Sequence, residues 1–177
     1  MNSKPVLVAI AAAVVVAVTA CSGSGAGSAS GSGLPTDYSH PFPHERQVTV
    51  AQAAPSAGFP VDVPNTGIAN EKTLTKVWVS PAHQVALVFD GGKVTIMMWR
   101  AIYHDPASFY AKLRVGLHAK SMIAHSNGYP LLVITPHTDP TGKNPAWVEF
   151  DKAGVDTNIA SQTYGTATLL AIARSMT

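Results

Sequence analysis

The stretch Gln84–Arg100, QVALVFDGGKVTIMMWR, decides the fold of this chain. It contains two short and mainly apolar runs, Val85–Phe89 and Val94–Trp99, and in a strand every second residue of such a run lies on one face. Between the runs, Asp90-Gly91-Gly92 predicts a hairpin turn, because glycine adopts positive φ at no steric cost. The buried face of this hairpin is expected to carry Val85, Leu87, Phe89, Val94, Ile96 and Met98.

The same alternation predicts strands on both sides of this hairpin. One strand, Leu74–Ser80, precedes it, and four strands follow it as two further hairpins. Asn127-Gly128 and Lys152-Ala153-Gly154 supply the turns of these hairpins. The four later strands are expected at Met122–His125, Pro130–Thr135, Pro145–Asp151 and Val155–Gln162.

Three helices complete the expected pattern. Thr49 and Gln52 form a capping box that begins a helix ending at Gly58. Asp105-Pro106 supplies an N-cap and a favourable first residue for a second helix, and a third is expected over residues 165–175. Hairpins dominate, so we expect an α+β fold, a mainly antiparallel sheet of about six or seven strands with about three helices packed on one face.

The N-terminus carries a targeting signal. Lys4 precedes an apolar run, Val6–Val18, that is shorter than the roughly 20 residues a membrane-spanning helix needs. The run ends in Val18-Thr19-Ala20-Cys21, which resembles the lipobox of bacterial lipoproteins, although leucine is more usual at its first position. The resemblance implies that residues 1–20 are a lipoprotein signal peptide. It also implies that Cys21 carries diacylglycerol by a thioether, with a further acyl chain such as palmitate on its amine.

Two other interpretations of this segment stay open. Val18-Thr19-Ala20 also fits the small-residue cleavage site of an ordinary secretory signal, which would leave Cys21 as a free thiol. In the other interpretation, the leader is not cleaved and stays in the membrane as an anchor. Lipidation predicts attachment to the cell membrane at its extracytoplasmic face, because two or three acyl chains hold a protein there stably.

A flexible tether follows the cysteine. Ser22–Gly33 contains only Gly, Ser and Ala, which cannot bury enough apolar surface to offset chain entropy. Pro35, Pro41 and Pro43 then favour extended structure. We expect a lipidated Gly/Ser/Pro-rich tether over residues 21–46 and a single globular α+β domain over 47–177.

Charge and cysteine content limit the function classes. The chain has 12 Lys+Arg against 10 Asp+Glu with no basic patch, so we expect no nucleic-acid partner. Cys21 is the only cysteine, so the fold has no internal disulfide.

The candidate binding surface consists of methionine and aromatic residues near the strand expected at 93–100. A strand that is apolar on both faces is either buried on both or contacts a partner, and methionine adapts to irregular partner surfaces. The residues expected there are Met97, Trp99, Tyr103 and Tyr110. Ordinary core packing beneath helices is the competing interpretation.

The sequence predicts no catalytic residue, metal site or cofactor. Its one cysteine is assigned to lipid, and its serines lack the Gly-x-Ser-x-Gly motif. Glu149, Asp151 and Asp156 gather around one expected hairpin without the spacing of a calcium loop. We interpret these three acids as a solvated turn.

The order of the elements resembles a bacterial domain family of unknown function. Its members occur in lipoproteins and in the outer parts of anti-sigma-factor-like membrane proteins. The resemblance covers most of residues 47–177, implies a fold and an extracytoplasmic location, and supplies no catalytic residues. It is carried by Val50–Ala54, Phe59-Pro60-Val61, Asp90-Gly91-Gly92, Asn127-Gly128-Tyr129 and Trp147–Phe150.

These observations predict a membrane-anchored extracytoplasmic lipoprotein that acts as a non-catalytic binding or interaction module of the cell envelope. Its expected partners are the membrane, through the lipid anchor, and an envelope protein or lipid. The alternative is a carrier of lipid or of a small hydrophobic ligand. An envelope enzyme is the third hypothesis.

Overall fold

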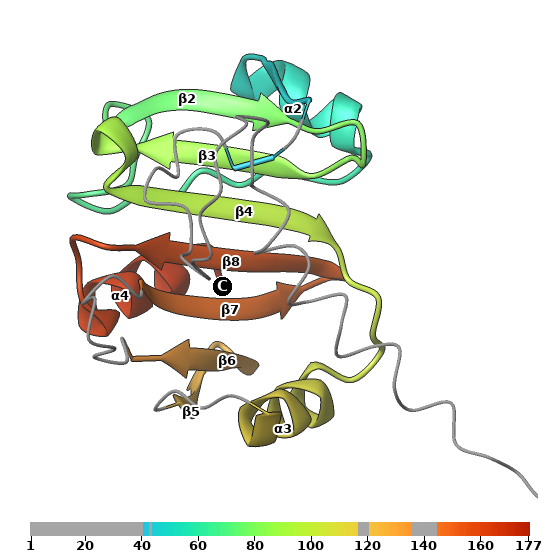
Figure 1. Cartoon of the computed structure of the whole chain (residues 1–177), viewed down its shortest axis with the longest axis vertical. Helices are drawn as coiled ribbons and strands as arrows, with labels where there is room; N and C mark the ends of the chain where they lie inside the picture. The colour runs from blue at the N-terminus through green and yellow to red at the C-terminus, as the bar shows by residue number, and fades with distance from the viewer. Residues whose placement is uncertain (1–40, 43, 117–120, 136–144) are drawn as a thin grey trace, which may run out of the picture.

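The predicted hairpin lies near the centre of an eight-stranded antiparallel sheet (Figure 1). Its strands, β3 (Val85–Phe89) and β4 (Val94–Arg100), pair so that Leu87 lies opposite Ile96. The turn between them is a short 3-10 segment, Asp90–Gly92, in which all three residues have positive φ. The computed structural model describes residues 41–42, 44–116, 121–135 and 145–177. The expected leader (1–20), Cys21 and most of the expected tether lie outside these described residues.

Two groups of four strands meet at the pair β4–β8, giving the order β1-β2-β3-β4-β8-β7-β6-β5. Every neighbouring pair is antiparallel, which confirms the α+β fold with one strand more than expected. The remaining strands are β1 (Arg46–Gln47), β2 (Leu74–Val79), β5 (Ser121–Ser126), β6 (Tyr129–Ile134), β7 (Ala146–Lys152) and β8 (Val155–Ser161).

The extra strand is β1, which shifts the start of the folded part. Its residues Arg46 and Gln47 pair with Val79 and Trp78 of β2. Further upstream, Phe42 packs against the side chains of Trp78, Ala86 and Val88. The sheet therefore begins at Arg46, the last residue of the range that the sequence assigned to the tether, and Phe42 within that range already packs on the sheet. Composition alone did not predict these contacts.

The helices begin where their capping residues predict. Helix α2 (Val50–Ala57) starts at the capping box of Thr49 and Gln52 and ends at Gly58 with φ 76°. Helix α3 (Pro106–Gly116) follows Asp105, whose side chain accepts a hydrogen bond from the backbone N–H of Ser108 at 3.2 Å. Helix α4 (Thr166–Met176) closes the chain. In the described part of the chain, none of these helices is long and apolar enough to cross a membrane.

The helices are divided between the two faces of the sheet. Helices α2 and α4 cover one face, here called the core face, and their buried residues Ala53, Ala57, Leu169 and Ile172 join its main apolar cluster. Helix α3 instead packs with Tyr110 against Leu132 and Ile134, whose side chains point to the opposite face.

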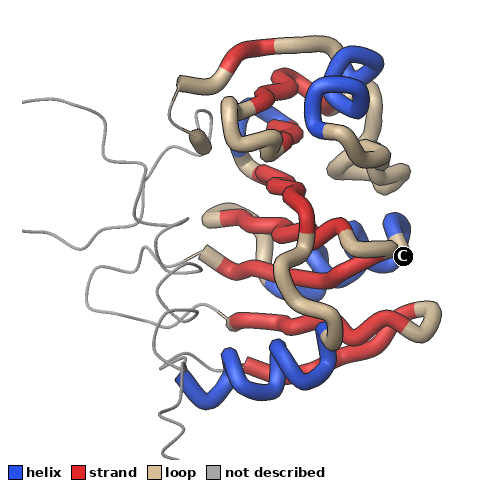
Figure 2. The backbone as a smooth tube through the Cα atoms, turned by 90° about the vertical axis from the view of Figure 1, so that its right-hand side faces the viewer, coloured by secondary structure: helices blue, strands red, loops and turns tan. Residues whose placement is uncertain are grey.

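The expectation that all helices share one face is therefore wrong. In Figure 2 the strands stack from top to bottom and α3 lies at the lower end, beside β5 and β6. The opposite face, here called the mixed face, carries apolar side chains from β2, β3 and β6 and polar ones from β7 and β8. On this face, Met97 of β4 packs against the cluster of Trp78, Ala86 and Val88, so β4 is apolar on both sides.

Candidate functional site

The four residues predicted as a binding surface all belong to the mixed face. Met97 and Trp99 alternate with the core residues Ile96 and Met98 of β4, so they point away from the core face. Tyr103 lies in the connection after β4 and stacks on Phe109 of α3, with ring centroids 4.1 Å apart.

Their exposure differs along this face. Met97, Trp99 and Tyr103 are half-buried. Tyr110 is 0 % exposed, so it lies inside the packing between α3 and the sheet and offers no surface to a partner.

Strand pairing places buried carboxyl groups beside these aromatic residues. On the mixed face, Glu149 of β7 lies opposite Asn158 of β8, and Asp156 of β8 lies opposite Trp99 of β4. Glu149 and Asp156 are only 3 % and 2 % exposed. We call Tyr103, Tyr110, Glu149, Asp156 and Asn158 the carboxyl–tyrosine cluster.

The hydrogen bonds within this cluster are long for ionised groups. The amide of Asn158 donates to Glu149 Oε2 at 3.4 Å, and the Tyr110 hydroxyl donates to Asp156 Oδ1 at 3.5 Å. The hydroxyls of Tyr103 and Tyr110 are 3.0 Å apart. Charge-assisted bonds to carboxylates are normally below 3 Å, so this set of donors stabilises negative charge weakly.

Burial accordingly favours the neutral forms of the two carboxyl groups. Removal from water raises the pKa of Glu149 to about 7, and the amide of Asn158 opposes this only in part. Burial also raises the pKa of Asp156 well above its usual range, and the negative charge of Glu149 adds to the effect. Burial therefore favours protonated forms of the cluster at pH values at which two exposed carboxyl groups would be ionised.

The interpretation of Glu149, Asp151 and Asp156 as a solvated turn is wrong. All three are buried, with Asp151 the most exposed at 9 %. Only Asp151 performs a turn function, because its Oδ1 accepts a hydrogen bond from the backbone N–H of Gly154 at 3.1 Å. The one signal in the sequence was alternation, since Glu149 lies between Val148 and Phe150 in a strand pattern and must point to the other face.

A shallow cleft opens on the core face of the same three strands. The register places Met98, Thr157 and Phe150 in one row across β4, β8 and β7, and Arg100, Val155 and Lys152 in the next row. Its cavity volume is about 120 Å³. Pro60 and Asp62 from the segment after α2, together with Met176 of α4, complete its walls.

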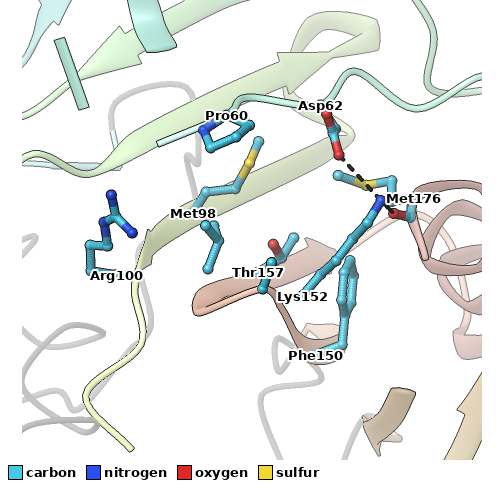
Figure 3. A pocket seen from close by; sticks show the side chains of 10 residues that line it. Pro60, Asp62, Met98, Arg100, Phe150, Lys152, Thr157 and Met176 are labelled. Atoms are coloured by element: carbon cyan, nitrogen blue, oxygen red, sulfur yellow. Dashed lines mark hydrogen bonds and ion pairs between the residues drawn. The ribbon is translucent and has the colours of Figure 1, made fainter. Parts of the chain in front are cut away.

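The two cations at the mouth of the cleft have different partners (Figure 3). Lys152 Nζ contacts Asp62 Oδ2 at 3.4 Å and donates to the backbone oxygen of Met176 at 2.6 Å. Arg100 donates to the backbone oxygen of Gly58, and its guanidinium carbon is 5.9 Å from the centroid of Phe59. No carboxylate of the described residues pairs with Arg100, so the mouth keeps an uncompensated positive charge.

The cleft was not predicted from the sequence. Alternation correctly placed Met98 on the core face, but the cleft also requires the pairing of β4 with β8, which are separated by α3 and three strands along the chain. The described residues contain no group of three or more His, Cys, Asp or Glu side chains that could hold a metal ion.

Comparison of the chain with family models, with curated proteins and with solved structures finds no match. The resemblance to the lipoprotein domain family therefore stays a prediction.

Proposed function

We propose that this protein is a lipid-anchored, non-catalytic binding module on the extracytoplasmic face of a bacterial cell membrane. The observation that carries the proposal is Val18-Thr19-Ala20-Cys21 directly after a short apolar run. The Gly/Ser/Ala composition of residues 22–33 supports it, because this composition and length predict a linker with a reach on the order of 20 Å between lipid and domain.

The cleft on the core face is the part of the domain that we assign to a partner. Its volume of about 120 Å³ is well below the roughly 300–1,000 Å³ of ordinary small-molecule sites. It suits one large apolar side chain, which would lie on Met98, Val155 and Phe150. The positive charge of Arg100 favours a carboxylate next to that side chain. We therefore propose a protein segment with an apolar residue beside Asp or Glu as the occupant.

The alternative of a lipid carrier receives less support. An acyl chain contributes about 0.8 kcal/mol for each methylene that it buries, so a carrier needs a long apolar cavity. The cleft is both short and polar at its mouth, where Arg100, Lys152 and Asp62 meet.

The anchor is tested by metabolic labelling with an alkyne fatty acid in a bacterium that expresses the whole chain. The parent protein is expected to carry the label and to lack residues 1–20, whereas Cys21→Ala carries none and keeps the leader. An unlabelled parent whose leader is removed would support ordinary secretion, and an unlabelled parent that keeps its leader would support an uncleaved anchor. Either result would end the lipoprotein proposal.

The partner chemistry is tested separately with ten-residue random peptides displayed on phage and the whole chain, in detergent, as bait. We expect enrichment of a large apolar residue next to Asp or Glu. The enrichment should disappear with Arg100→Glu and persist with Lys112→Glu, which reverses an exposed charge on α3 away from the cleft. Enrichment without acidic residues, or equal loss with both variants, would contradict the assignment.

A further inference from the structure

The strongest feature that binding at the cleft leaves unused is the carboxyl–tyrosine cluster beneath α3. We infer that the buried carboxyl groups of Glu149 and Asp156 keep α3 and the preceding connection packed on the mixed face while they are protonated, and that their ionisation releases this segment. This inference concerns the opposite face from the cleft and is independent of the proposed function.

The first observation that supports this inference is that the carboxyl–tyrosine cluster connects the sheet to α3 and the preceding connection. Glu149 and Asp156 belong to the central strands β7 and β8. Tyr103 and Tyr110 belong to the covering segment. The Tyr110 hydroxyl donates to Asp156, and the Tyr103 hydroxyl lies 3.0 Å from the Tyr110 hydroxyl. The charge state of the carboxyl pair therefore acts directly on the contact between this segment and the sheet.

The second support is the set of charged and titratable groups on the packed elements. The third carboxyl, Asp151, lies opposite Asp156, so it adds negative charge to the same face. On α3, Lys112 and Arg114 are exposed, and Arg114 donates to the backbone oxygen of Ser121 on β5. The other charged groups of these elements are exposed or point to the core face: His104, Asp105, Arg100, Lys152 and His125.

None of the described cations compensates the pair. Two carboxylates that are buried together without a cation repel each other and forfeit hydration. Ionisation of both groups is therefore relieved by admitting water, and the cover that must move is the one that carries the tyrosines. The pKa of Glu149, raised by burial to about 7, places this change near neutral pH.

The third support is the contrast between α3 and the other long helix. Helix α4 buries Leu169, Ile172, Ala173 and Met176 in the main core. Helix α3 contributes the fully buried Tyr110, with Phe109 and Leu113 only partly buried. Local opening selects the segment with the least buried apolar surface, so α3 opens before the sheet does.

Hydrogen exchange read by mass spectrometry tests the inference on the whole chain in detergent micelles. Exchange is compared at pH 5.5 and 8.5 after correction for the intrinsic change of exchange rate. We expect the protection of residues 106–116 to fall by more than tenfold, because the opened state releases the Glu149 proton at a lower pH than the packed state does. Opening therefore becomes more favourable as pH rises towards the packed-state pKa of about 7, and no further above it. Protection of residues 166–176, helix α4, should stay constant, and this constancy is the control that the rest of the fold is intact.

Variants separate a proton effect from general loosening. Glu149→Gln, and Asp156→Asn as an independent variant, should each weaken the pH dependence of α3 protection and raise this protection above that of the parent at pH 8.5, because each removes one of the two buried carboxyl groups. Glu71→Gln changes an exposed carboxyl outside the cluster and should keep the parental pH dependence. The inference is overturned if α3 and α4 lose protection together, or if Glu149→Gln keeps the parental pH dependence.

Discussion

The two faces of the strands β4, β8 and β7 are built from alternate residues of the same sequence, yet they have opposite chemistry. On the core face, the register aligns Met98, Thr157 and Phe150 in the cleft beside α4. On the mixed face, it aligns Met97, Asn158 and Glu149 near the cover of α3. Burial alone therefore does not define a core, because the mixed face buries carboxyl groups whose ionised forms are disfavoured by that burial.

The largest effect is expected from the core face. Phe150→Ala leaves a cavity under α4, and we expect a loss of about 3–5 kcal/mol in the free energy of unfolding. Leu113→Ala on α3 removes a partly buried side chain and should cost less than half of this. Guanidinium unfolding of both variants measures the difference. Equal losses would mean that the two faces contribute alike to global stability.

The next effect has the opposite sign and belongs to the mixed face. In the unfolded chain, the Glu149 side chain has the ordinary glutamate pKa of 4.5, whereas in the folded protein its pKa is about 7. Between these values the unfolded state releases its proton first, so stability falls as pH rises and stays low above pH 7. Glu149→Gln removes this cost and should stabilise the protein by about 3 kcal/mol at pH 8, with almost no change at pH 4.

Urea unfolding at both pH values checks this prediction. The matched change Glu71→Gln should stay within about 0.5 kcal/mol of the parent throughout. A destabilised Glu149→Gln at pH 8 would show that the carboxylate is well solvated or paired, and the contrast between the faces would then fail.

A smaller effect is expected from Tyr110, which links α3 to the sheet. Tyr110→Phe keeps the ring but removes the hydroxyl between Tyr103 and Asp156. We expect a loss of about 1–2 kcal/mol, larger at pH 8 than at pH 5, since the lost donor stabilises the ionised carboxyl most. Unfolding curves at the two pH values measure this loss. A loss of stability that is independent of pH would show that the Tyr110 hydroxyl does not stabilise the ionised carboxyl.

The smallest effects are expected at the N-terminal caps of α2 and α3. Thr49→Ala removes the capping box of α2 and should cost about 1 kcal/mol in global unfolding, whereas Thr49→Ser retains most of it. Asp105→Ala removes the cap of α3 and should appear as faster hydrogen exchange over residues 106–116. Should Asp105→Ala lower global stability more than Thr49→Ala does, α3 would be part of the main cooperative unit.

Local features of this fold could be predicted from the sequence because they depend on neighbours along the chain. The turn at Asp90-Gly91-Gly92, the cap at Thr49 and the end of α2 at Gly58 each follow from local backbone chemistry. Alternation in β3 and β4 likewise fixed which residues of the hairpin face the core.

Features that depend on long-range pairing could not be predicted in this way. Nothing local specifies that β4 pairs with β8, which brings Arg100 beside Val155 and Trp99 beside Asp156. The same pairing creates the cleft and the carboxyl–tyrosine cluster. Glu149 and Asp156 therefore looked like turn residues, although one strand pair buries both of them.

The most direct test of the contrast between the two faces is the titration of the Glu149 side chain itself. Carbon-13 NMR of the carboxyl group, assigned by comparison with Glu149→Gln, follows its chemical shift from pH 3 to pH 9 in the whole chain. The account predicts a midpoint near 7, as burial dictates. A midpoint at or below 4.5 would contradict it, because the carboxyl would then be ionised at neutral pH without cost to the fold.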